Sequence, residues 1–401
     1  MSLMANLFQN NKYNPIFWAE EALEHLRDSL GMSRRVYWGY ANERQTEGAQ
    51  KGDTITITVP GLLTATNDEN RTPEDLNTGS RNIMLNTYTK SDFAVTDREL
   101  SYGSDAIVQD HIGEAMFRVV EDIDTKLIDL TKRIPYRIAA DNDVANDLVN
   151  GKTALFDNGV RVDREMIHFG IDSTAYNALL KSGIYSSANI AGSNANAALI
   201  KGSLDERFGI TPFPMQRAAV THTTGTIATQ GSAQVGALVA AQTTNDTTVA
   251  VDGLTAGLTI KSGDPFTIAG NSQKYVVTAD ALVDVGGAVT LSVWPNLVIA
   301  YEEDAAVTFD ETPVAGGTYQ GLAMFNDKAF ALVPVALPTA GAEIGSVRMY
   351  TAVDEETGMA VRATISYNPN GIGKVTVKYD ALFGCDLIDP NRAVQVCRAV
   401  V

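Results

Sequence analysis

The chain has 401 residues, of which 45% are hydrophobic and 20% charged, a composition typical of globular rather than disordered proteins. Its 31 basic and 48 acidic residues give a formal net charge of −17, which argues against tight binding to a nucleic-acid backbone. Two cysteines, Cys385 and Cys397, make neither a disulfide framework nor a zinc site. Because one hydrophobic core seldom serves more than about 250–300 residues, we expect more than one domain.

The beginning of the sequence has no features of a signal peptide. Residues 1–13 are polar and rich in Asn, without a basic segment followed by an apolar one, and we expect them to form a mobile arm. No run of about 18 apolar residues occurs, so no membrane span is predicted. We therefore expect a soluble protein that is made and used in a cytoplasm.

A short amphipathic helix is predicted after this arm. Asn14 is a capping residue type, and Pro15 suits the first helical turn. Apolar residues then recur at steps of three and four up to Gly31, which ends the helix, namely at Ile16, Ala19, Leu23, Leu26 and Leu30. Such a helix needs its own core or a neighbouring subunit to cover its apolar face.

An extended β-arm is predicted next. Residues 51–60 (KGDTITITVP) alternate Thr with Ile or Val, a pattern typical of a strand with one solvent-exposed face. Residues 61–80 are polar and loop-like, and residues 81–100 return as extended segments. Because two-stranded ribbons are marginal in water, we expect this arm to bury little against its own domain and to rest on something else.

The longest predicted element is a helix over 104–133. Ser104 is placed to cap it and Pro135 to stop it, and at 1.5 Å per residue it would run about 45 Å. Its apolar stripe consists of Val108, Ile112, Ala115, Val119, Ile123, Leu127 and Leu130. A rod of this length suits a flat, extended subunit, although an ordinary long core helix explains the pattern equally well.

Shorter elements follow the long helix. We expect a weak helix over 139–149, a strand over 165–171, and a helix from Asp172 or Ser173 to Leu180. Residues 209–215 (GITPFPM) predict a strand or turn.

The composition changes over 219–317, where Thr, Ala, Val and Gly dominate and charge is sparse. Short alternating runs predict a small all-β barrel or sandwich, at 248–254, 258–261, 265–269, 274–278, 288–294 and 305–309. The mixed pattern resumes at Tyr319, so this segment is predicted to be an insertion whose two ends lie close together.

The last part of the chain is predicted to be rich in strands. Turns are expected at Asn326-Asp327 and at 389–392, and a strand at 374–379. Residues 347–352 and 359–366 flank a polar segment and predict a hairpin.

No residue pattern points to catalysis, a cofactor or a metal. The four histidines stand in no metal-binding or catalytic motif, and no nucleophile elbow, phosphate loop or dinucleotide fingerprint occurs. Asp141, Asp143 and Asp147 match a calcium loop only loosely. The acidic run Glu302, Glu303 and Asp304 is either a solvated face or a surface that pairs with a basic patch on a neighbouring subunit.

Taken in order, these elements resemble the tailed-phage major capsid proteins of the HK97-like fold, in the branch of the P22 coat protein. The segments that carry the resemblance are GDTITITVP at 52–60, LNTYTKSDFAVTDREL at 85–100, GDPFTIAG at 263–270, GLAMFNDKAFALVPVALP at 321–338 and VKYDALFGCDLIDPNRAVQV at 377–396. The last of these is similar to the family's closing strand, with Phe383 in place of the usual tyrosine.

The resemblance implies an α+β fold with a defined division of the chain. It implies an N-terminal arm and helix at 1–40, an E-loop at 41–95, the spine helix and P-domain at 96–149, an A-domain at 150–218 and 318–345, an inserted β-barrel domain at 219–317, and a C-terminal P-domain segment at 346–401. In that family a loop of the insertion bridges capsomers. Residues 242–247 are the best local candidate, with Asp246 as an ion-pairing residue.

The function implied is that of a non-enzymatic shell subunit. Copies would form hexamers and pentamers of an icosahedral head, together with scaffolding, portal and decoration proteins, assembled in the bacterial cytoplasm around double-stranded DNA. An encapsulin-like nanocompartment shell that encloses an enzyme is the alternative within the same fold. An enzyme or carbohydrate-binding β-module is a third hypothesis, which would need a pocket with convergent polar groups.

Overall fold

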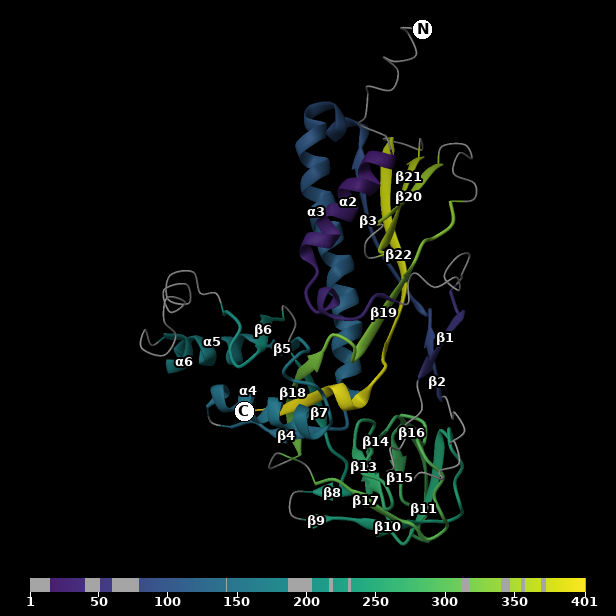
Figure 1. The fold of residues 1–401 in the computed structure, drawn as a ribbon. Coiled ribbons are helices and arrows are strands. Elements are labelled where there is room, and N and C mark those ends of the chain that lie inside the picture. The colour runs from purple at the N-terminus through teal and green to yellow at the C-terminus, as the bar shows by residue number, and fades with distance from the viewer. Residues whose placement is uncertain are drawn as a thin grey trace, which may run out of the picture. The chain divides into compact units, whose positions relative to one another are not determined.

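The computed structural model describes residues 15–39, 51–59, 79–141, 143–186, 204–215, 219–229, 232–311, 313, 317–339, 347–354, 358–368 and 373–400. The predicted arm over 1–13 and most of the predicted loop over 61–80 lie outside this part of the chain. Two compact units are present, one made of Met1–Ile57, Asn82–Leu127 and Phe330–Asp386, the other of Thr58–Arg81, Ile128–Ala329 and Leu387–Val401. Each unit combines helices with sheets, as expected for an α+β fold (Figure 1).

The first unit contains a five-stranded sheet. Its order is β19 (Phe330–Val335), β22 (Lys374–Leu387), β21 (Ala360–Asn368) and β20 (Val347–Val353), and β3 (Thr87–Thr96) also pairs with β22. The predicted hairpin is confirmed, with Val347 opposite Ser366 in an antiparallel pair. β22 runs well beyond the predicted 374–379, because buried apolar residues such as Leu382 and Phe383 extend the strand.

The N-terminal helix of this unit is confirmed as α2 (Pro15–Ser29). Its buried face packs against β20 and β21 through Trp18, Ala19, Ala22 and Leu26. The short helix η2 (Ser33–Arg35) follows, and the Ser33 amide donates a hydrogen bond of 2.9 Å to the Asp124 carboxylate. A Cβ atom at Gly31 would lie 2.4 Å from that carboxylate, so any other residue at this position would displace the Asp124 side chain.

The long helix is confirmed as one continuous element, but its predicted start is wrong. α3 spans Asp97–Leu130 and continues as η4 (Thr131–Arg133), so Ser104 lies inside the helix and does not cap it (Figure 1). The apolar period predicted only part of the helix, because it does not extend to the residues before Ser104. Ile112, Val119, Ile123 and Leu127 of the predicted stripe are buried.

The extended arm is partly different from its prediction. β1 (Thr54–Val59) and β2 (Gly79–Met84) pair as a two-stranded sheet, whereas residues 87–95 belong to β3 and the five-stranded sheet. The base of the ribbon packs closely on β22, because a Cβ at Gly384 would lie only 2.7 Å from the Met84 carbonyl oxygen. The expectation that the arm buries little on its own domain is therefore wrong for the base, where Ile83 is buried.

The second unit contains a six-stranded sheet. Five strands follow the order β4 (Arg137–Ala139), β23 (Ala393–Ala399), β18 (Thr318–Asn326), β5 (Ile167–Ile171) and β6 (Ile210–Pro214), and β7 (Val220–Thr223) also pairs with β18. β4 pairs with β23 in parallel, as β6 does with β5, and the remaining pairs are antiparallel. η6 (Pro390–Arg392) forms at the predicted turn before β23. β18 and β19 flank the predicted Asn326-Asp327 turn but belong to different sheets.

Helices cover this sheet, and one of them differs from its prediction. Ala139 lies in β4, and α4 (Val144–Asp157) begins later and runs further than the expected 139–149, because Asp143 caps it through the Ala145 amide at 3.0 Å. α5 (Ser173–Lys181) is capped by Asp172, one of the two predicted caps, through the Ala175 amide at 2.8 Å. α6 (Gly183–Ser186) follows.

A closed barrel lies between β7 and β18 in the sequence, which settles the predicted choice between barrel and sandwich. Its strands are β10 (Val235–Leu238), β11 (Thr248–Asp252), β16 (Val289–Trp294), β14 (Lys274–Val277), β13 (Pro265–Ile268) and β17 (Ala306–Phe309). The predicted run at 258–261 instead forms β12 (Thr259–Ile260), which pairs with β15 (Ala281–Leu282), while β8 (Ala228–Thr229) pairs with β9 (Ser232–Ala233). β10 was not predicted, because its VGAL sequence is short and contains glycine.

Candidate functional site

Two loops close one end of the barrel and contain the four residues predicted to contact a neighbouring subunit, Asp246, Glu302, Glu303 and Asp304. Residues 239–247 connect β10 to β11, and residues 295–305 connect β16 to β17. Gln242 and Tyr301 exchange backbone hydrogen bonds of 2.9 and 3.0 Å, and Asn245 donates to Leu297 at 2.8 Å. We call this end of the barrel, formed by residues 239–247 and 295–305, the acidic end.

Asp246 stabilises its own loop. Its carboxylate accepts a hydrogen bond of 2.7 Å from the Thr243 amide and one of 3.0 Å from the Thr243 hydroxyl. Asn245 has a φ of 75°, a left-handed conformation that asparagine tolerates better than most residues. The carboxylate of Asp246 therefore shapes the loop, and its predicted ion pair with a neighbouring subunit stays a prediction.

Glu302, Glu303 and Asp304 are exposed at the same end. Asp304 has a φ of 64°, and its amide donates to the Leu238 carbonyl oxygen at 3.0 Å, which fixes the loop against β10. Within the described residues, none of the three carboxylates makes an ion pair or a side-chain hydrogen bond. Three adjacent negative charges are thus held in solvent by an ordered backbone.

A buried tyrosine pair supports the acidic end from inside the barrel. The Tyr275 and Tyr301 hydroxyl oxygens lie 2.9 Å apart, and the Val298 amide donates to the Tyr275 oxygen at 3.3 Å. Burial raises the pKa of both phenols above the ordinary value. Both hydroxyls therefore stay neutral near pH 7 and hold the 295–305 loop on the barrel core.

A buried histidine–aspartate pair, which the sequence did not single out, joins β7 to the start of barrel strand β13. His222 Nε2 lies 3.0 Å from Asp264 Oδ1, and both side chains are buried. Asp264 Oδ2 accepts hydrogen bonds from the amides of Gly225 at 2.9 Å and Lys261 at 2.8 Å. Asp264 stands directly before β13, but its burial depends on residues distant in sequence, so its role could not be predicted from that position.

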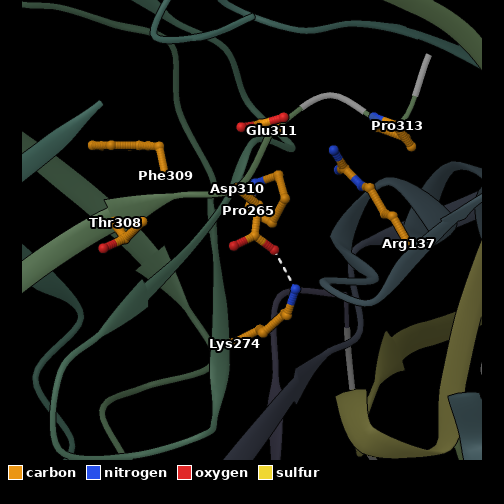
Figure 2. Close-up of a pocket in the computed structure, with 8 residues that line it drawn as sticks. All are labelled: Arg137, Pro265, Lys274, Thr308, Phe309, Asp310, Glu311 and Pro313. Atoms are coloured by element: carbon orange, nitrogen blue, oxygen red, sulfur yellow. Dashed lines mark hydrogen bonds and ion pairs between the residues drawn. The ribbon is translucent and has the colours of Figure 1, made fainter. Parts of the chain in front are cut away.

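A pocket of about 350 Å³ lies near this junction (Figure 2). Lys274 forms an ion pair with Asp310, shown dashed in Figure 2, and the Arg137 guanidinium donates to the Gly263 carbonyl oxygen. Arg137 and Lys274 face the same pocket as Asp310 and Glu311, so its charges balance and select no ion of either sign.

The loosely calcium-like aspartates are used within the fold. Asp143 caps α4, and Asp147 is buried and accepts the Asp141 amide at 2.7 Å. In the described ranges, no group of three or more His, Cys, Asp or Glu side chains is arranged to hold a metal ion. No helix in the same ranges has the length and apolar character needed to cross a membrane.

Comparison with known proteins found similarities in structure at low sequence identity. No family model matches the sequence, and no curated protein matches it. A chain from a structure of Mycobacterium phage Che8 is 11% identical, with 90% of each chain covered and a TM-score of 0.45. A chain from the capsid structure of cyanophage P-SCSP1u is 11% identical, covering 88% of this chain and 85% of that one, with a TM-score of 0.46.

The crystal structure of a virus-like particle from Pyrococcus furiosus contains a chain that is 12% identical, covering 96% of this chain and 99% of that one, with a TM-score of 0.41. These three similarities extend over most of the chain, yet each has a TM-score below 0.5. They are too distant to assign a function, which has to come from the chain's own residues.

Proposed function

We propose that this chain is the major capsid protein of a tailed double-stranded DNA phage, with an HK97-like fold and the barrel as an inserted domain. The observation that carries the proposal is the order of elements along the chain. A short helix precedes a β-ribbon, one 34-residue helix, a mixed sheet interrupted by a closed barrel, and a strand-rich end. This is the order on which the sequence resemblance rests.

The proposed parts of the subunit follow the division of the chain expected from the sequence. β1 and β2 belong to the E-loop, α3 is the spine helix, and the barrel is the insertion between the two A-domain segments. A contact of this E-loop with a neighbouring copy is proposed from the order of elements and not from exposure of the ribbon, whose Ile55, Ile57 and Ile83 are buried. Head-to-tail contacts that close into rings would then give hexamers and pentamers.

The charge of the chain supports a container rather than a nucleic-acid-binding protein. A net charge of −17 disfavours tight binding to DNA phosphates, which is consistent with a shell that encloses DNA without sequence-specific contacts. Scaffolding, portal and decoration proteins are the expected partners, the virion is the expected location, and assembly would take place in the host cytoplasm. The role is structural, with no reaction or cofactor.

The acidic end of the barrel is proposed as a contact between copies. Glu302, Glu303 and Asp304 are exposed without an ion pair in the described part of the chain, so a basic surface of a neighbour would gain by meeting them. Asp246 would support this contact by shaping the adjoining loop.

Electron microscopy of the purified chain, expressed with and without its scaffolding partner, tests the proposal. Closed shells or isolated rings of subunits are the expected result. Persistent monomers under both conditions would overturn it. Particles that enclose a co-purified enzyme instead of DNA or scaffold would favour the nanocompartment alternative.

A further inference from the structure

A tight turn at Phe208 and Gly209 connects residues 204–207 to β6. Arg207 and Ile210 exchange backbone hydrogen bonds of 3.1 and 2.9 Å across it. Both central residues have positive φ, 55° at Phe208 and 73° at Gly209, a geometry normally built from Asn-Gly. A bulky aromatic residue is an outlier in this conformation, so the turn itself does not explain why phenylalanine is present.

Phe208 belongs to a larger exposed apolar surface. Lys152 of α4 donates its amine to the Phe208 carbonyl oxygen, which places the turn beside this helix. Val149 and Phe156 lie three residues before and four after Lys152, on the same helix face, and are 45% and 65% exposed. Met166 precedes Ile167, which pairs with Ile210, so the backbone of Met166 lies beside the turn.

Met166 is 64% exposed and Phe208 is 49% exposed. We call the four side chains of Val149, Phe156, Met166 and Phe208 the Phe208 surface. The strand next to it, β6, is at the edge of the six-stranded sheet and carries Pro212 and Pro214. Because proline cannot donate a ladder hydrogen bond, an added strand is disfavoured at this edge, and a partner would bind through side-chain packing.

We propose that the Phe208 surface is a contact between copies of this chain, an inference that rests on the shell function proposed above. At their exposed fractions the four side chains present roughly 400 Å² of mostly apolar surface, comparable to the largest apolar patch of a typical monomer, which is often functional. A stable pairwise complex buries about 800 Å² on each partner. The surface is therefore too small to hold a dimer alone and suits one of several contacts that each copy makes in a closed assembly.

The substitution Phe208→Asn separates this role from a structural one. Asparagine tolerates the left-handed conformation, so the isolated subunit should unfold at the same or a higher temperature than the wild type. Removing the exposed ring should at the same time raise the protein concentration required for assembly by at least about tenfold, measured by light scattering and electron microscopy. Phe156→Gln, on the exposed face of a helix, should raise that concentration without affecting folding.

Val285→Asn is the matched control, because Val285 is fully exposed between β15 and β16, outside the Phe208 surface, and it should assemble like the wild type. Oxidation of Met166 by hydrogen peroxide should be slower in assembled particles than in free subunits. Assembly of Phe208→Asn and Phe156→Gln at the wild-type concentration, or equal Met166 oxidation in both states, would overturn the inference and leave the shell function intact. Failure of the wild type to assemble would overturn both.

Discussion

Arg362 Nη2 lies 2.6 Å from Oδ2 of Asp380, whose carboxylate is completely buried in the five-stranded sheet. Lys378 lies 2.9 Å from the same oxygen, and the Tyr88 hydroxyl donates to it. Burial by itself would raise the pKa of Asp380, but the hydrogen bonds from Arg362, Tyr88 and Lys378 together lower it below the ordinary value. One buried charge thus connects β3, β21 and β22, and a slip in register would separate it from its cations.

Asp380→Asn should destabilise the protein by about 3 kcal/mol at pH 7 in urea unfolding, because Arg362 and Lys378 lose their counter-charge. The folded-state pKa of Asp380 is depressed, so the wild type has this stabilisation above the ordinary value of 3.8 and loses it as the pH falls through the folded value. The difference between the two proteins should therefore shrink in acid. Asp92→Asn, at an exposed position of β3, is the control, and an equal loss there would contradict the prediction.

Asp147→Asn should have the opposite effect. Burial raises the pKa of Asp147 to about 6, and Oδ2 has no hydrogen-bond partner within the described part of the chain. The charged form therefore costs stability, and this cost develops as the pH rises from about 4 to about 6. The variant should be about 2 kcal/mol more stable than the wild type at pH 7 and no more stable below pH 4. A gain that does not depend on pH would rule out this explanation, and Asp157→Asn, at an exposed position of the same helix, should not reproduce the gain.

Asp264→Ala should weaken the attachment of the barrel. The substitution removes the acceptor for His222 and for two backbone amides, and a loss of about 3 kcal/mol is expected in thermal or urea unfolding. Asp280→Ala is the comparison, because Asp280 is mostly exposed and pairs with Lys261. Its effect should be much smaller, since exposed ion pairs contribute little. Similar losses for the two variants would contradict the assigned role of Asp264.

Gly384→Ala should displace the base of the ribbon. The new Cβ would lie 2.7 Å from the Met84 carbonyl oxygen and 3.0 Å from Ile83, so backbone must move, at a cost of about 1–3 kcal/mol. Hydrogen exchange over β1 and β2 should accelerate. Gly113→Ala is the contrast, because its Cβ meets only His25 at 4.0 Å inside α3, and it should stabilise the protein by about 0.5–1 kcal/mol. A neutral result at Gly384 would show that the contact is not tight.

Glu303→Lys should impair assembly if the acidic end meets a basic surface of a neighbour. The expected result is a higher critical concentration for assembly, with an effect that weakens in salt. Asp252→Lys makes the same change of charge at the end of β11, away from the two loops of the acidic end. Equal assembly of Glu303→Lys and the wild type would remove this surface from the proposed contacts.

Periodic patterns predicted much of the fold. The spacing of apolar residues located α2 and most of α3, and alternation located the β20–β21 hairpin and five barrel strands. Pattern could not show that α3 begins at Asp97 or that β22 continues to Leu387, because ends of elements depend on capping and on tertiary contacts. Nor could it show which charges are buried, since Asp380 and Asp264 resemble surface residues until distant partners are brought to them.

The candidate surfaces were predicted unevenly. Asp246 and the acidic run 302–304 were singled out separately, and the fold brings them to one end of the barrel through pairing that the sequence did not indicate. The Asp246 carboxylate stabilises its own loop by accepting a hydrogen bond from Thr243, and a pattern of charges along the sequence does not predict such a contact. The Phe208 surface was missed, because phenylalanine is not a residue expected at a left-handed turn, and Gly209 was the only local signal.

The strand order of the six-stranded sheet has a consequence for synthesis on the ribosome. β23, formed by residues 393–399, lies between β4 and β18, so β4 has no neighbouring strand until those residues have emerged. The sheet therefore cannot be completed while translation of the preceding residues is still under way. Nascent chains are thereby kept from presenting a finished sheet too early, and for the proposed shell subunit this delay would separate folding from association in time.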